Sequence, residues 1–166
     1  MMFADIPSGE NVFFDANTFI FHFINEPKFG QACTDLIVRA GIGDIVAHTS
    51  THAMSEVSHR LMTIEAERVF GWPMAAIGKK LRKNPVAIQS LNLYSKAIRD
   101  ILAFSIRILN IDPMWIQRAT QLSDAHGLLS NDALIVAAME AHGITAIASN
   151  DSDFDRVPTL RRYAPV

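Results

Sequence analysis

The sequence predicts an α/β fold in which helices cover both faces of a parallel sheet. Short runs of β-type residues alternate along the chain with segments whose apolar residues recur at helical spacing. Strands that alternate with helices in this way form parallel sheets between helical layers. The 166 residues are 49% hydrophobic and 19% charged, which is a globular composition, and we expect one domain over residues 1–166.

The first half of the chain contains two predicted strands and three predicted helices. Pro27 follows the first helix, Gly41 and Gly71 end the next two, and Ser50 is suited to cap the third. The third helix also carries an apolar stripe that includes Val57. In chain order, we expect a strand at 11–14, a helix at 17–25, a helix at 29–40, a strand at 44–49 and a helix ending near residue 71.

The second half begins with a segment that prolines divide. Pro73 and Pro85 break residues 72–106 into a short helix and a longer one, which we interpret as a helical insertion. Pro113 favours the first turn of a later helix, and Gly143 ends the last one. The other expected elements are a strand at 107–111, a helix at 113–127, a helix from Ser130 or Asn131 to about 142 and a strand at 144–149.

Charge and cysteine content exclude several classes of protein. The formal net charge of −2 argues against coating nucleic acid by bulk electrostatics, although it allows a local basic patch. Cys33 is the only cysteine, so no internal disulfide is expected. The first residues carry Asp5 and Glu10 and lack the basic start of a signal peptide, and no apolar run is long enough for a membrane helix. We expect a cytoplasmic protein with no membrane partner.

Several acidic residues follow predicted strands. Asp15 ends the first strand, Asp151 and Asp153 follow the strand at 144–149, and Asp132 opens the helix before that strand. Ligands of open parallel sheets bind beyond the carboxyl ends of the strands, so we expect these acids to meet at one edge. Clustered carboxylates without basic partners raise one another's pKa unless a cation compensates, and oxygen ligands select Mg²⁺ or Mn²⁺. The pattern indicates metal-assisted phosphoryl chemistry.

Each acid also has a purely structural explanation. Asp15 is suited to cap the helix that follows it, and Asp132 interacts favourably with the dipole of its own helix. Asp153 and Asp155 are typical of a polar turn. Glu56 lies away from the apolar stripe of its helix, so periodicity alone predicts a solvated face. Taken residue by residue, the pattern leaves both interpretations open.

Four segments together resemble the PIN-domain ribonucleases, including the VapC-type toxins of toxin–antitoxin pairs. They are VFFDANTFI around Asp15, TSTHAMSEVSHRL around Glu56, GLLSNDALIVAAM around Asp132 and AIASNDSDFDRVP around Asp151. The segments occur in the family's order. With the strand and helix pattern, the resemblance covers essentially the whole chain.

The resemblance implies a three-layer α/β/α sandwich and a Mg²⁺- or Mn²⁺-dependent endoribonuclease that cleaves single-stranded or structured RNA. It implies a catalytic site made of Asp15, Glu56, Asp132 and Asp151, in which the metal ligands are Asp15, Asp132, Asp151 and Asp153. It also implies a homodimer and, if the chain is the toxin of a type II pair, a cognate antitoxin.

Two further residues match the family at positions that support the acids. Asn17 is a frequent family residue suited to donate a hydrogen bond to a ligand. Ser149 stands where many members have Thr, and it keeps a hydroxyl that can orient a carboxylate or a phosphate. The helical insertion around 72–106 makes this chain longer than the compact toxins of the family.

The helical insertion carries a cluster of basic residues in the sequence GKKLRKNP. An RNA backbone near the metals would be held by Lys79, Lys80, Arg82 and Lys83. The same residues suit a solvated helix end, where the dipole favours lysine. Trp72 and Trp115 are better explained by packing than by base stacking.

Two other functions compete with the nuclease. The segment Asp15 to Thr18 faintly resembles the nucleophile motif of haloacid-dehalogenase-like phosphatases, but Asn17 stands where that chemistry uses a second acid. A catalytically inactive RNA-binding or interaction protein is the other alternative, since an acidic site can outlast its activity. Formation of an aspartyl-phosphate on Asp15 would distinguish the phosphatase.

Overall fold

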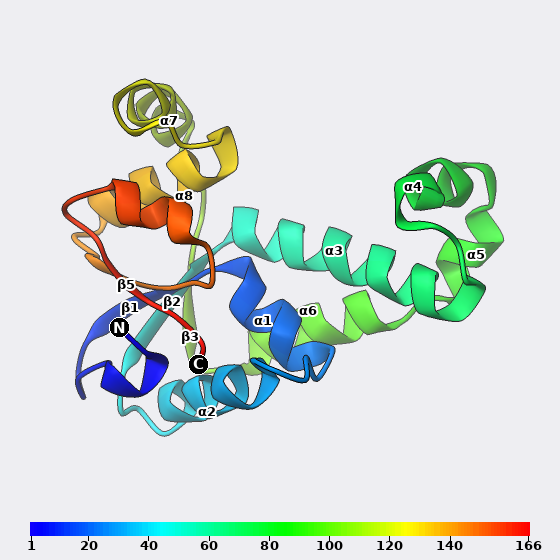
Figure 1. Ribbon diagram of the computed structural model, residues 1–166, viewed down its shortest axis with the longest axis horizontal. Helices are drawn as coiled ribbons and strands as arrows, with labels where there is room; N and C mark the ends of the chain where they lie inside the picture. Colours follow the sequence, from blue (N-terminus) through cyan, green and yellow to red (C-terminus); the bar gives the residue numbers. More distant parts are fainter.

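The computed structural model describes residues 1–166, and its centre is a five-stranded sheet in which every pairing is parallel (Figure 1). The strand order is β3-β2-β1-β4-β5. The strands are β1 (Asn11–Phe14), β2 (Val46–Ser50), β3 (Ile106–Leu109), β4 (Ala146–Ala148) and β5 (Arg161–Tyr163).

The chain forms eight α-helices. In chain order they are α1 (Ala16–Phe23), α2 (Gly30–Gly41), α3 (Thr51–Phe70), α4 (Met74–Lys83), α5 (Pro85–Ser90), α6 (Leu93–Ala103), α7 (Pro113–His126) and α8 (Ser130–Ala141). Short 3-10 segments lie at Phe3–Asp5 and Ser152–Arg156. None of the helices is long and apolar enough to cross a membrane.

The alternation of side chains along β1 separates two cores. Val12 and Phe14 face one side of the sheet and pack with residues of α1, α2, α3 and α6. Phe13 faces the other side and packs with residues of α7 and α8. Because neighbouring residues of a strand point to opposite faces, one short strand supports both helical layers. The predicted α/β/α sandwich with a central parallel sheet is confirmed.

Local signals set several helix ends as the sequence predicts. The Ser50 hydroxyl accepts a hydrogen bond from the Ala53 N–H at 3.1 Å and caps α3. Gly71 ends α3 in the left-handed region, with φ 62°, which costs glycine little. Pro113 is the first residue of α7.

The predicted insertion is only partly an insertion. Ala97 and Ile101 of α6 are fully buried in the main core, so α6 belongs to a layer of the sandwich. Only α4 and α5 stand apart, at the far end of α3 (Figure 1). The 20 residues of α3 make a helix about 30 Å long, and its distal half packs with α4 and α5 around a separate small core.

The strand predictions miss one strand and shift the ends of others. β2 begins at Val46 and runs to Ser50, two residues after the expected start and one after the expected end. β5 was not expected, because its sequence is Arg-Arg-Tyr and gives no apolar pattern. Its pairing with β4 and the burial of Tyr163 create the strand, and both are tertiary effects.

Candidate active site

Asp15 lies at the carboxyl end of β1, in the middle of the sheet. Its carboxylate caps α1 by accepting a hydrogen bond from the Ala16 N–H at 2.6 Å. The residue is only 7% exposed, which is unusual for an aspartate without a cation beside it. The structural role proposed for Asp15 as a helix cap is therefore real, and the burial shows that it is not the whole explanation.

A hydrogen-bond network joins Asp15 to the loop after β4. The Ser149 hydroxyl donates to Asp15 Oδ2 at 2.6 Å, and the Asn17 amide donates both to Asp15 and to Ser149 Oγ. Ser149 Oγ also accepts from the Asp151 N–H at 3.0 Å, and the Asn150 N–H donates to Asn17 Oδ1 at 3.2 Å. Asn17 and Ser149 thus hold the Asp15 carboxylate and the Asp151 loop in one arrangement.

Four of the expected acids face a single cavity of about 260 Å³ at this edge of the sheet. Glu56 reaches it from the second turn of α3, and Asp132 from the first turn of α8. The full lining is Asp15, Asn17, Ile20, Phe21, Glu56, Arg60, Asp132 and Asp151. Asp15 and Asp151, which are 136 positions apart in the chain, meet here because β1 pairs with β4.

Burial and like charge both act on the carboxylates of the cavity. Burial raises the pKa of Asp15 to about 7, and the charges of Glu56 and Asp132 add to the rise, against the hydrogen bonds from Ser149 and Ala16. Burial also raises the pKa of Asp132 to about 6. Both shifts mean that the folded protein resists placing full negative charge here.

The chemistry of the acids fits a hard divalent cation. Four carboxylates line the cavity, and a bound cation would offset the burial and the repulsion that raise two of their pKa values. No three acidic, histidine or cysteine side chains converge closely enough to hold an ion as they stand. The donor set therefore fits, and side-chain rotations would be needed to close it around an ion.

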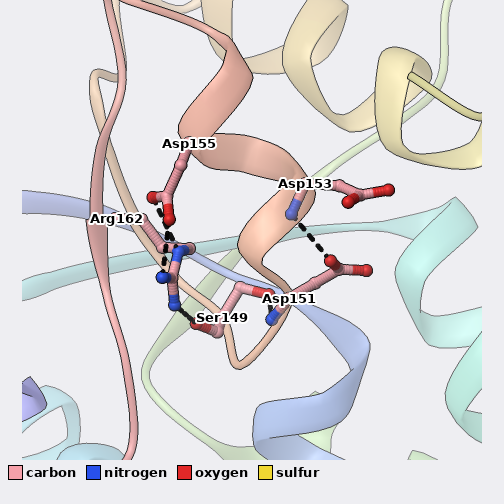
Figure 2. Close-up of polar contacts among 5 residues, drawn as sticks. All are labelled: Ser149, Asp151, Asp153, Asp155 and Arg162. Atoms are coloured by element: carbon pink, nitrogen blue, oxygen red, sulfur yellow. Dashed lines mark hydrogen bonds and ion pairs between the residues drawn. The ribbon is translucent and has the colours of Figure 1, made fainter. Parts of the chain in front are cut away.

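The acidic loop after β4 is internally paired (Figure 2). Asp151 accepts a hydrogen bond from the Asp153 N–H at 2.8 Å. The Asp153 carboxylate also forms an ion pair with Arg156 at 2.9 Å. Asp155 binds Arg162 through two hydrogen bonds of 2.8 Å. Asp153 does not line the acidic cavity, although its charge contributes to the raised pKa of Asp132.

The expectation that the acids lack basic partners is wrong. Arg60 lines the acidic cavity one helical turn after Glu56, and Arg156 opposes the rise in the pKa of Asp132. Arg162 donates to the Ser149 carbonyl at 3.2 Å and so fixes the end of β4. The spacing of four residues between Glu56 and Arg60 is the sequence signal that could have found this cation.

A second polar pocket of about 270 Å³ adjoins the acidic cavity and shares two residues with it. Its lining is His52, Ser55, Glu56, His59, Arg60 and Asn131. Sequence reasoning missed this pocket, because its residues lie on the solvated faces of α3 and α8. It extends the site along the polar side of α3.

The basic cluster does not lie beside the acids. Its four residues are at the end of α4, and Lys80 lies over the Trp72 ring at 5.2 Å. From Glu56 to Phe70 there are 14 residues of α3, which is about 21 Å of helix. The cluster therefore does not lie near the expected metal ligands, because the distal half of α3 separates the two sites, and its RNA binding stays a prediction.

The fold and the cavity define a class of protein: a parallel α/β sandwich with converging carboxylates at the carboxyl edge of its sheet. The sequence model of the PIN domain matches residues 12–160, and the chain belongs to this family. The family resemblance read from the four sequence segments is confirmed. The match to the PIN-domain model gives no support to the phosphatase alternative.

Solved structures similar to this chain are VapC toxins and toxin–antitoxin complexes. VapC20 from Mycobacterium tuberculosis, described as a Sarcin-Ricin loop cleaving toxin, has a TM-score of 0.62 and 16% identity over 87% of this chain and 92% of that one. VapBC2 from Rickettsia felis, bound to a promoter DNA fragment, has a TM-score of 0.56 and 14% identity over 93% and 98%. A toxin–antitoxin complex from Klebsiella pneumoniae has a TM-score of 0.55 and 18% identity over 90% of this chain and 95% of that one. No curated protein sequence matches the chain significantly.

Proposed function

We propose that this protein is an endoribonuclease that uses Mg²⁺ or Mn²⁺ to hydrolyse phosphodiester bonds of RNA in the acidic cavity. One observation carries the proposal: four carboxylates from four separate elements face one cavity, and two of them have raised pKa values. A fold does not need such an arrangement, because mutual repulsion destabilises it. A cation-binding catalytic site explains why the chain tolerates it.

The residues that would hold the metal are Asp15, Asp132 and Asp151, with Asp153 released from Arg156. A bound cation would supply charge neutralisation at the scissile phosphate and an acidified water. Ser149 and Asn17 keep the Asp15 carboxylate facing the cavity through their hydrogen bonds. Arg60 also lines the cavity, one helical turn after Glu56, and its guanidinium suits the non-bridging oxygens of a phosphate.

The proposal also includes a protein partner. Because several similar structures are toxin–antitoxin complexes, we include a cognate antitoxin and a role as the toxin of a type II pair. Co-expression with the product of an adjacent small reading frame should yield a complex in which RNA cleavage is lost. We also include a homodimer, for which light scattering should give twice the 18.4 kDa chain mass.

Cleavage assays test the enzyme directly. Single-stranded and hairpin RNAs should be cleaved with Mg²⁺ or Mn²⁺ and left intact in excess chelator. Glu56→Gln should reduce the rate at least about a hundredfold, the equivalent of about 2.7 kcal/mol of transition-state stabilisation. Glu67→Gln, the same change at an exposed position of the same helix, is the matched control and should leave the rate unchanged.

The assay also separates the enzyme from the inactive alternative. RNA that binds but is never cleaved under any metal condition would identify a binding protein. Undiminished cleavage in chelator would reject the metal mechanism while leaving a ribonuclease.

A further inference from the structure

The charges of this chain are divided between two regions. Residues 68–99, which we call the basic arm, contain seven of the 15 lysines and arginines and none of the 17 aspartates and glutamates. The rest of the chain keeps eight basic and 17 acidic residues, a net charge of −9 against +7 on the arm. The small overall charge of −2 hides this separation.

The basic arm is built as a projection. It comprises the end of α3, all of α4 and α5, and the first part of α6, and its tip extends away from the sheet (Figure 1). Its small core contains Ile77, Leu81, Ala87 and Leu91, which pack against Ala66 of α3 just outside the arm. This core fixes α4 against α3 and so gives the basic side chains of α4 a defined place relative to the acidic cavity.

The cations of the arm lack acidic partners, although Lys80 lies over the Trp72 ring. All seven are exposed, and none forms an ion pair. In the rest of the chain, five arginines form ion pairs: Arg39, Arg118, Arg156, Arg161 and Arg162. Seven like charges on one projection repel one another, so the fold alone gives no reason to gather them there.

We propose that the basic arm binds the phosphate backbone of the RNA whose scissile bond lies in the acidic cavity, an inference that rests on the proposed function. The stretch of α3 between the two regions is about 21 Å long, or about six nucleotides at the roughly 3.4 Å rise of a stacked strand. The substrate class is therefore an RNA long enough to contact both regions. Shorter RNAs reach the cavity without the arm.

The surface of the arm favours a nucleic acid over an acidic protein. None of the four cavities of the molecule is lined by a residue of the arm, so no pocket there would take the apolar anchor of a protein partner. What the arm offers is a series of flexible cations, and such cations bind phosphates without regard to sequence.

Binding of RNA oligonucleotides in excess chelator tests the proposal without any cleavage. The arm variant is Lys79→Gln with Lys83→Gln, two exposed positions that leave Lys80 on Trp72. The control is Arg107→Gln with Arg118→Gln, which removes the same charge from exposed positions on β3 and α7. Dissociation constants are measured for RNAs of four to twenty nucleotides at several salt concentrations.

The wild type and the control should bind more tightly once the RNA exceeds the spanning length, and the arm variant should lose most of this gain. For long RNAs, each lost phosphate contact removes about 0.7 from the slope of log affinity against log salt, so the slope should fall by about 1.4 in the arm variant. Changing Arg82 and Lys80 to Gln as well should bring the fall to about 2.8.

The proposal is overturned if the affinity of the arm variant depends on RNA length and on salt in the same way as that of the wild type. The arm would then serve a different partner. A different result would reject the proposed nuclease function. If no RNA is cleaved with any metal, the nuclease is rejected, yet a length-dependent gain that requires the arm would still establish RNA binding there.

Discussion

The acidic cavity and the basic arm carry charges of opposite sign, and they differ in how far these charges are exposed to solvent. Asp15 is almost completely buried, and its carboxylate is held by hydrogen bonds from three residues. The cations of the arm are exposed and make no ion pair. Buried charge alters pKa values and stability, whereas exposed charge is screened by water and salt.

This difference in burial predicts how each region responds to substitution and to pH. Substitution or protonation in the cavity should alter the stability of the whole chain, because β1, α1 and the β4 loop meet there. Removal of charge from the arm should alter binding and leave stability nearly unchanged.

Asp132→Asn should have the largest effect. RNA cleavage should fall at least about a hundredfold, because the cavity loses a carboxylate on which the metal depends. In chelator, the variant should melt above its parent, since the change removes repulsion with Glu56 and Asp151. Thermal unfolding across a Mn²⁺ titration should show less stabilisation than the roughly 2.7 kcal/mol expected for the parent at a hundredfold excess over Kd.

Asp124→Asn, an exposed change on α7, is the control for Asp132→Asn. A variant of Asp132 that melts below its parent in chelator, and gains as much from metal, would mean that Asp132 only stabilises its helix.

Ile77→Ala should destabilise the arm locally. Ile77 is fully buried in the small core of the arm, where such truncations cost about 2–5 kcal/mol, yet few residues surround it. Hydrogen exchange should accelerate in α4 and α5 while β1 and β4 keep their protection. Cleavage of RNAs shorter than six nucleotides should persist.

Ile147→Ala is the comparison for Ile77→Ala, since Ile147 is equally buried but lies in β4. It should lower the melting temperature of the whole chain and weaken cleavage. Equal global unfolding in both variants would show that arm and sheet form one cooperative unit.

The metal-free protein should lose stability as the pH rises from about 4 to about 7. Asp15 has a pKa of about 7 and Asp132 of about 6 when folded, against 3.8 when unfolded, so the folded state binds protons more tightly in this range. Their stabilising effect is complete below pH 3.8 and is lost as the pH passes the folded values. Melting temperatures in chelator at pH 5 and pH 7.5 measure the loss.

The double variant Asp15→Asn with Asp132→Asn should flatten this pH dependence. An unchanged profile in the double variant would place the responsible groups elsewhere in the chain.

Arg156→Gln should have the smallest effect. Arg156 pairs with Asp153 at the surface and opposes the rise in the pKa of Asp132, so its removal should raise that pKa slightly further. Because Arg156 is half exposed, little change in stability is expected. Carbon NMR titration of the Asp132 carboxyl measures the shift, and a lowered pKa would contradict the assigned geometry.

Much of the architecture was predictable because the signals are local. Residues that are close in sequence determine the strand β1, the cap of α3 at Ser50 and the end of α3 at Gly71. The acids after β1 and β4 were also predictable, since the carboxyl ends of parallel strands share an edge. The family resemblance named the same acids and added Glu56.

The remaining features depended on contacts between distant segments. Glu56 has no helical-periodicity signal, because a residue that faces a cavity and one that faces water occupy the same polar side of a helix. Arg60 and the pocket beside it were missed for the same reason. β5 exists only because β4 pairs with it.

Local patterns thus account for most of the strands and helices and for the acids at the strand ends, because backbone preferences and apolar spacing act over short distances. Contacts between distant segments decide that α6 belongs to the core, that Arg60 lines the same cavity as Asp15, and that the basic cluster lies far from the acids. Those outcomes depend on the strand order and on the length by which α3 extends beyond the sheet. Both are properties of packing that no local pattern encodes.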